Sequence, residues 1–228
     1  MKLLLFDIDG TLIRSSGAGR DAMKLALDDV YGKSGPVAKY NMSGKTDARI
    51  VHDLMTAVGL DADEIDAGLT AVYTRMAVHA EEVYGDHKVM PCPGIPELLE
   101  ALVARDDVLM GLVTGNTAQT SPLKLAAGGI APSIFKVGAY GSDRMDRNQL
   151  PALAMERATA LTNHSFVGQN TVVIGDTPAD IMCARAGETT AVIVATGWHA
   201  MDTLLPYQPD HLFENFKDRD AVIEELMR

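Results

Sequence analysis

The chain opens with an apolar run that ends in two carboxylates: Leu3-Leu4-Leu5-Phe6-Asp7-Ile8-Asp9-Gly10-Thr11. A run of this kind is typical of a buried strand, and side chains two residues apart leave a strand on the same side. Asp7 and Asp9 are therefore expected to point into one space, where like charges repel and burial is costly. A divalent cation would relieve that repulsion, as would a division of roles between an ionised and a protonated acid.

The composition is that of a globular protein, with 47% apolar and 22% charged residues among 228. A net charge of −11 and an aromatic content of 5% disfavour a nucleic-acid partner, because neither a basic field nor stacking residues are available. The opening apolar run ends after four residues, which is too short for a membrane segment. Cys92 and Cys183 provide no disulfide framework. We expect a cytoplasmic protein, monomeric or dimeric.

Short apolar runs alternate with segments of helical periodicity over most of the chain. The runs expected to be buried strands are residues 2–6, 108–113, 134–139, 172–174 and 191–195. Strands that alternate with helices predict an α/β fold, a Rossmann-like doubly wound parallel sheet with helices on both faces. In such sheets a ligand binds beyond the carboxyl ends of the strands.

Residues 15–88 interrupt this alternation, because they contain helical patterns and no convincing strand. Helices are expected over residues 18–31, 47–58 and 64–84. We therefore expect a core made of residues 1–14 and 89–228, and an inserted helical cap of residues 15–88. A cap joined by two linkers beside a strand-end site is placed to act as a lid, and a helical subdomain without motion is the alternative.

Two later strand ends carry polar residues of the same kind. In Leu112-Val113-Thr114-Gly115-Asn116, a hydroxyl and free backbone amides emerge where a strand stops, and such groups bind anions. Val173-Ile174-Gly175-Asp176-Thr177-Pro178-Ala179-Asp180 repeats the opening pattern of apolar strand, acid, small polar residue and second acid. Asp180 falls in the first turn of a helix, so it either caps that helix or serves the site.

A basic residue between these two strands completes the set, and the candidates are Arg144 and Arg147. Hard oxygen ligands of this kind suit Mg²⁺, whereas the lack of cysteine and histidine at the strand ends disfavours zinc. A carboxylate held beside Mg²⁺ can attack phosphorus as a nucleophile. The cation and the arginine would offset the charge on the transferred oxygens.

Taken in order, these segments resemble the motifs of the haloacid dehalogenase superfamily: Asp7-Ile8-Asp9-Gly10-Thr11, Thr114, a basic residue and Gly175-Asp176-Thr177-Pro178-Ala179-Asp180. Within it, the chain resembles the phosphoglycolate phosphatase-like hydrolases over nearly its whole length. The resemblance implies that Asp7 is the nucleophile and that Asp9 is the general acid and then the base. It also implies that Mg²⁺ is bound by Asp7, the backbone carbonyl of Asp9 and Asp176.

The same resemblance implies roles for the remaining site residues. Thr114, with the amide of Gly115 or Asn116, would hold the phosphate, and Asp180 would orient either Arg147 or the metal shell. Members of the family usually carry a lysine in the third motif, where this chain has Arg147. The implied activity is Mg²⁺-dependent hydrolysis of a small phosphorylated metabolite through an aspartyl-phosphate intermediate.

Other activities compete with this interpretation. A sugar phosphomutase of the same superfamily would share the core residues, whereas a non-catalytic phosphate- or metal-sensing module would not need both Asp7 and Asp9. A dehalogenase is disfavoured, because the resemblance would then imply neither Asp9 nor a metal. A lyase acting through a Schiff base would need a buried lysine in the cap. Lys45 is the obvious position for one, and it is either a substrate contact or a solvated surface lysine.

Overall fold

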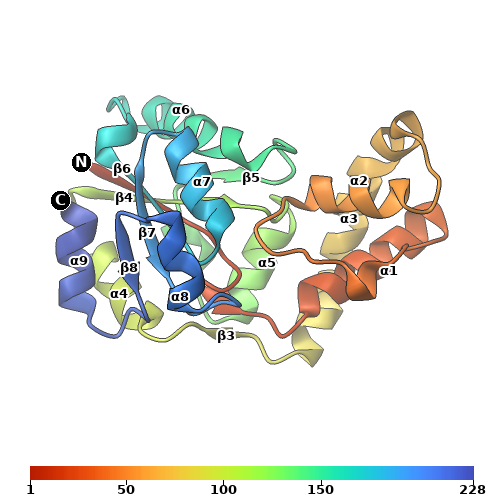
Figure 1. Ribbon diagram of the computed structural model, residues 1–228, viewed down its shortest axis with the longest axis horizontal. Helices are drawn as coiled ribbons and strands as arrows, with labels where there is room; N and C mark the ends of the chain where they lie inside the picture. The colour runs from red at the N-terminus through yellow and green to blue at the C-terminus, as the bar shows by residue number, and fades with distance from the viewer.

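A six-stranded parallel sheet forms the centre of the larger part of the molecule in the computed structural model, which describes residues 1–228 (Figure 1). From edge to edge the strands are β5 (Val137–Tyr140), β4 (Val108–Thr114), β1 (Lys2–Phe6), β6 (Thr171–Gly175), β7 (Thr190–Val194) and β8 (His211–Phe213). β1 lies in the middle, paired in parallel with β4 on one side and β6 on the other. The predicted doubly wound α/β fold is confirmed.

Apolar side chains of β1 point alternately to the two faces of this sheet, and helices cover both. Leu4 and Phe6 belong to one buried cluster, and Leu3 and Leu5 belong to another. The helices that contribute to the first cluster are α4 (Ile95–Val103), α5 (Thr120–Ala127) and α9 (Arg219–Met227), and those in the second are α6 (Leu150–Thr162) and α7 (Pro178–Ala186). A strand buried on both faces has no polar alternation, which explains the continuous apolar run that opens the chain.

Three helices lie beside the sheet, at the right of Figure 1: α1 (Ala18–Tyr31), α2 (Asp47–Thr56) and α3 (Ala62–Asp86). We call residues 18–86 the helical module. It has its own apolar core, to which α1 contributes Leu27, α2 contributes Leu54 and α3 contributes Val72. The three helices predicted in this segment are therefore present, although α2 ends and α3 begins two residues earlier than expected.

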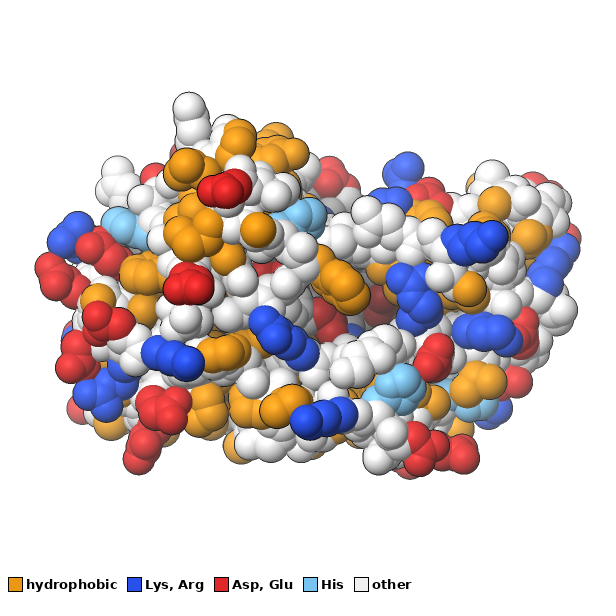
Figure 2. Space-filling model, turned by 60° about the horizontal axis from the view of Figure 1, so that its bottom comes forward, with side chains coloured by type: hydrophobic (Ala, Val, Ile, Leu, Met, Phe, Trp, Pro, Cys, Tyr) orange, Lys and Arg blue, Asp and Glu red, His pale blue; other side chains and the backbone are white.

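Two chain crossings join the module to the rest of the molecule, and they lie side by side. β2 (Ile13–Arg14) precedes the module, β3 (Met90–Pro91) follows it, and the two pair as a short antiparallel ribbon. The space-filling view shows a hollow between the two parts (Figure 2). None of the helices combines the length and the apolar character needed to cross a membrane.

Two details of the sheet differ from expectation. The strand predicted over residues 134–139 begins only at Val137, because Pro132 opens a 3-10 turn that extends to Ile134. The edge strand β8 was not predicted. It is three residues long and only half-buried, so it leaves no continuous apolar run in the sequence. The short helix α8 (Met201–Leu204) precedes it.

Candidate active site

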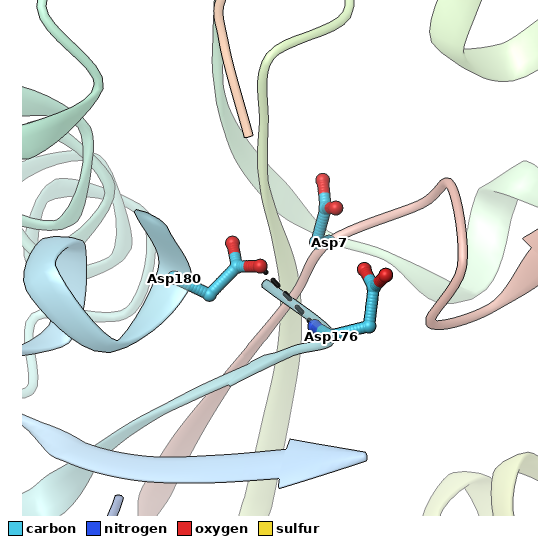
Figure 3. A group of neighbouring side chains, drawn as sticks. All are labelled: Asp7, Asp176 and Asp180. Carbon is cyan, nitrogen blue, oxygen red and sulfur yellow. Dashed lines mark hydrogen bonds between the residues drawn. The ribbon is translucent and has the colours of Figure 1, made fainter. Parts of the chain in front are cut away.

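Three carboxylates from separate parts of the chain converge beyond the carboxyl ends of β1 and β6. Asp7 follows β1 directly, Asp176 follows β6, and Asp180 lies in the first turn of α7. One oxygen from each lies within 4.8 Å of one from each of the others, and all three side chains are buried. Figure 3 shows the three carboxylates directed into the same space.

The backbone around these acids holds them in place. The amide of Asp7 donates to the carbonyl of Ile174 at 2.8 Å, so the end of β1 is tied to the end of β6. Gly10 has a φ of 86°, and a Cβ there would collide with the carboxylate of Asp176. Glycine at this position thus allows both the turn after Asp9 and the close approach of Asp176.

Asp180 serves both the helix and the site. Its Oδ2 accepts hydrogen bonds from the amides of Asp176 (3.2 Å) and Thr177 (2.9 Å) and from the Thr177 hydroxyl (2.7 Å). Thr177 in turn caps α7, which completes a capping box. The other oxygen, Oδ1, accepts from Nη2 of Arg147. Both oxygens of Asp180 are therefore engaged, and Asp7 and Asp176 have more capacity for a further ligand.

Arg147 is the basic residue of this site. Its side chain is buried, and Nη2 lies 3.2 Å from Oδ1 of Asp7 while it also binds Asp180. Arg144, the other candidate from the sequence, is exposed and donates to the backbone carbonyl of Asp143 at 2.8 Å. The structure thus brings Arg147, and not Arg144, to the carboxylates.

The carboxylates outnumber the cations in this cluster, and their pKa values reflect it. Burial, supported by the charges of Asp180 and Asp9, raises the pKa of Asp7 to about 6 although Arg147 opposes the shift. Burial and the charges of Asp180 and Asp7 raise the pKa of Asp176 well above its ordinary value. The only hydrogen bond to the Asp176 carboxylate comes from the Thr11 hydroxyl, at 3.2 Å. Oxygen donors with excess negative charge fit a divalent cation such as Mg²⁺.

The end of β4 places a hydroxyl beside this cluster. Oγ1 of Thr114 accepts from the backbone amide (3.3 Å) and the side-chain amide (2.8 Å) of Asn116, so its own hydrogen is free to donate to an anion. Gly115 lies against the helical module, where a Cβ would collide with the carbonyl of Lys45. This turn is therefore packed against the module.

Asp9 faces a different set of partners from those of Asp7. Its Oδ2 accepts from Nζ of Lys124 at 2.7 Å and from Nδ2 of Asn116 at 2.9 Å, and its Oδ1 accepts from Ser15 Oγ at 3.0 Å. Burial pushes the pKa of Asp9 upward, but Lys124, Asn116 and Ser15 together hold it below its ordinary value.

Sequence reasoning did not identify Lys124. Its side chain is buried in α5, where neighbouring positions on the helix are buried as well. The available signal was a single charge within the apolar run Leu123-Lys124-Leu125-Ala126-Ala127. Burying an ammonium is costly unless it is paired, so a lone lysine in such a run indicates a carboxylate partner elsewhere in the fold.

The helical module reaches the strand ends through the start of α2. The amide of Asp47 donates to the carbonyl of Gly115 at 2.7 Å, and its carboxylate accepts from the amide of Thr117 at 3.0 Å. The hydroxyl of Thr46 donates to the carbonyl of Met145 at 2.7 Å. Burial raises the pKa of Asp47 to about 7, with Lys124 opposing and Asp9 adding to the shift. Asp47 was also not identified from the sequence.

Lys45 lies at the edge of the site. Its ammonium is 4.1 Å from the ring centroid of Tyr40 and 3.5 Å from Oδ2 of Asp53, so it is engaged within the helical module. Lys45 nevertheless lines a pocket of about 340 Å³, together with Arg49 of the module and Arg147 of the core. None of the clustered carboxylates lines this pocket, nor the larger one of about 550 Å³ farther along α2.

Comparison with known proteins places this geometry in a family. The family model described as haloacid dehalogenase-like hydrolase matches residues 4–194. A phosphoglycolate phosphatase from Rhodospirillum rubrum is 29% identical over 203 residues, which cover 86% of this chain and 80% of that protein. These matches confirm the predicted superfamily and indicate a hydrolase of the phosphatase type.

Solved structures show the same fold over the whole chain. A hydrolase from Pseudomonas syringae superimposes with a TM-score of 0.73 at 20% identity, with both chains fully covered. A Thermotoga maritima protein assigned as a β-phosphoglucomutase superimposes with a TM-score of 0.61 at 17% identity, covering 99% of this chain and all of its own. The likeness therefore extends over both the sheet and the helical module, and the family model spans most of the chain. The chain belongs to the haloacid dehalogenase-like hydrolase family.

Proposed function

We propose that this protein is a Mg²⁺-dependent phosphatase that hydrolyses a small phosphorylated metabolite through an aspartyl-phosphate on Asp7. One observation carries the proposal: Oδ1 of Asp7 lies 3.2 Å from Nη2 of Arg147, within a cluster that also contains Asp176 and Asp180. A carboxylate is a weak nucleophile unless neighbouring charges accept the oxygens of the group it attacks. Arg147 offers one such charge, and a cation would supply the other.

Asp7, Asp176 and the backbone carbonyl of Asp9 are the groups that would hold Mg²⁺. When bound, the cation supplies charge that offsets the phosphoryl oxygens and keeps Asp7 ionised at neutral pH. Arg147 contacts Asp7, and Asp180 fixes Arg147. Thr114, with the amide of Gly115 or Asn116, would donate hydrogen bonds to the remaining phosphate oxygens.

Asp9 would transfer protons in both steps. It would first protonate the leaving oxygen and then take a proton from the water that attacks the phosphoryl group on Asp7. Its carboxylate is ionised in the ligand-free site, because three donors contact it. An arriving phosphate dianion adds negative charge nearby, which raises the pKa of Asp9 toward the protonated form needed for the first step.

The helical module and its two linkers, together residues 15–88, would act as the cap. Hydrogen bonds from Thr46 and Asp47 to the core support a closed arrangement over the strand ends. Lys45 and Arg49, which line the 340 Å³ pocket beside Arg147, would provide positive charge for a small substrate. Phosphoglycolate is the first candidate substrate, since a curated relative is a phosphoglycolate phosphatase.

Hydrolysis of p-nitrophenyl phosphate with and without Mg²⁺, followed by a panel of phosphorylated metabolites that includes phosphoglycolate, tests this function. We expect turnover that depends on Mg²⁺, a loss of about 10³-fold or more in Asp7→Asn, and slower turnover in Asp9→Asn. Asp106→Asn, an exposed change of the same kind, serves as the control and should leave turnover unaltered. Full activity in Asp7→Asn would show that the nucleophile is misassigned.

A phosphomutase remains the second candidate, because a structure assigned as a β-phosphoglucomutase shares the fold. The core carboxylates would serve both reactions, so they do not separate them. Conversion of β-glucose 1-phosphate to glucose 6-phosphate in the presence of glucose bisphosphate would favour the mutase. Release of inorganic phosphate without such conversion would favour the phosphatase.

A further inference from the structure

Lys124 is a buried cation that has no role in the reaction proposed above for Asp7, Asp176 and Asp180. Its side chain retains 4% of its exposure, and it lies on the core helix α5, away from Asp7 and Arg147 in the sequence. Nζ donates to Oδ2 of Asp9 at 2.7 Å and to Oδ1 of Asn116 at 2.6 Å, and it lies 6.0 Å from the ring centroid of Tyr84. Desolvation of an ammonium is costly, so the pairing with Asp9 must offset it.

The contacts of Asp9 are unequal at its two oxygens. Oδ2 accepts hydrogen bonds from Nζ of Lys124 and Nδ2 of Asn116. Both nitrogens are donors only, so neither could accept a hydrogen bond from a proton on Oδ2. Oδ1 meets only the hydroxyl of Ser15, which can act as donor or acceptor. A proton on Asp9 is therefore accommodated at Oδ1 and excluded from Oδ2.

The same lysine joins Asp9 to the helical module. Tyr84 lies near the end of α3, and Gly19 lies at the start of α1, where a Cβ would be 3.0 Å from Nζ of Lys124. Ser15 lies in the linker that precedes α1. Asp9 is thus held between a core helix and the first linker of the module, while its side chain keeps 40% exposure.

We propose that Lys124 is a positioning residue for Asp9: it fixes Oδ2 so that Oδ1 carries the transferable proton and faces the leaving oxygen. The inference rests on the proposed phosphatase function. As the bond from Asp7 to phosphorus forms, the bond from phosphorus to the leaving oxygen breaks, and that oxygen keeps the electron pair and takes the proton from Oδ1 of Asp9. Without Lys124 the carboxylate can rotate, and both oxygens can carry the proton.

Two aryl phosphates that differ chiefly in the basicity of their leaving group test this role. Phenolate needs protonation as it leaves, whereas p-nitrophenolate is stable without it. Since kcat/KM reports the steps up to transfer of the phosphoryl group to Asp7, it isolates the proton transfer to the leaving oxygen. For Lys124→Met we expect kcat/KM for phenyl phosphate to fall at least tenfold more than kcat/KM for p-nitrophenyl phosphate.

Two variants complete the comparison. Lys124→Arg keeps the charge and should recover part of the loss with phenyl phosphate. Lys136→Met, the same change at an exposed lysine, should leave both substrates unaffected. If Lys124→Met does not fold by circular dichroism, Lys124→Arg carries the test, because its altered geometry should still lower phenyl phosphate hydrolysis more than p-nitrophenyl phosphate hydrolysis.

Equal falls in kcat/KM for the two substrates in a folded variant would overturn the positioning role and leave the phosphatase function standing. A wild-type protein that hydrolyses neither these substrates nor any member of the metabolite panel with Mg²⁺ would instead overturn the proposed function, and this inference with it. The wild-type assay is therefore run first, so that the two failures are distinguished.

Discussion

The guanidinium of Arg147 lies 3.2 Å from the carboxylate of Asp7, and a single nitrogen, Nη2, makes both this contact and the one to Asp180. Arginine differs from lysine in that two of its guanidinium nitrogens can bind at once, but Arg147 does not contact Asp7 and Asp180 in this forked way. Nε of Arg147 is buried and has no hydrogen-bond partner in the protein. The site therefore needs a positive charge at one point, and a lysine ammonium could supply it.

Replacing Arg147 by lysine and by glutamine tests this point. We expect Arg147→Lys to keep the fold and to lose about 10- to 100-fold in kcat, because the charge survives with altered reach. Arg147→Gln removes the one cation among three buried carboxylates, so it should lose far more activity and about 3–5 kcal/mol of unfolding free energy in metal-free protein. Urea unfolding with parallel kinetics measures both. Comparable losses in the two variants would mean that the guanidinium shape matters.

Asp176 provides a test of the cation site that does not depend on turnover. Burial and two neighbouring carboxylates raise the pKa of Asp176, so Asp176→Asn should make the metal-free protein more stable at pH 8. Mg²⁺ at about 100 times its Kd should stabilise the wild type by about 2.7 kcal/mol, and the variant by much less. Thermal unfolding with and without Mg²⁺ measures this, with Asp106→Asn as the control. A full Mg²⁺ shift in Asp176→Asn would place the cation elsewhere.

The overall fold could be predicted because its signals are local. Leu3–Phe6 are buried on both faces of the sheet, and that environment appears in the sequence as a continuous apolar run. The start of α7 was equally readable, since Thr177, Pro178 and Asp180 form its cap. β8 and the late start of β5 were missed, because a three-residue half-buried strand and a 3-10 turn leave no periodic pattern.

The site was predictable only in part. Asp7 and Asp176 follow neighbouring parallel strands, so their convergence follows from the order of the strands. Lys124 and Asp47 come from helices whose packing brings them to Asp9 and to the turn after β4. Such contacts depend on how α2 and α5 lie against the strand ends, and no spacing in the sequence encodes them.

Asp47 predicts a pH dependence of stability. Its pKa is raised to about 7 in the fold, against an ordinary value of 3.8, mainly by burial. Below about pH 4 the Asp47 carboxyl is protonated in both the folded and the unfolded protein, and its contribution to the free energy of unfolding is fully present. As the pH rises from about 4 to about 7, the unfolded state releases its proton first, so this contribution is progressively lost.

Asp47→Asn removes that loss and keeps an oxygen that can accept from the amide of Thr117. The difference in unfolding free energy, variant minus wild type, should therefore rise by about 1 to 4 kcal/mol between pH 4 and pH 7.5. Urea unfolding across this range measures it, with Asp106→Asn expected to show no such trend. A difference that stays constant with pH would mean that Asp47 is ionised throughout.

The central claim is that Asp7 takes the phosphoryl group, and chemical trapping examines it most directly. Enzyme mixed with substrate and Mg²⁺ is quenched with acid during turnover and reduced with borohydride, which converts an aspartyl-phosphate to homoserine. Peptide mass spectrometry then locates the change. We expect homoserine at position 7 and an unchanged Asp9. Homoserine at another aspartate, or none at all while phosphate is released, would contradict the account.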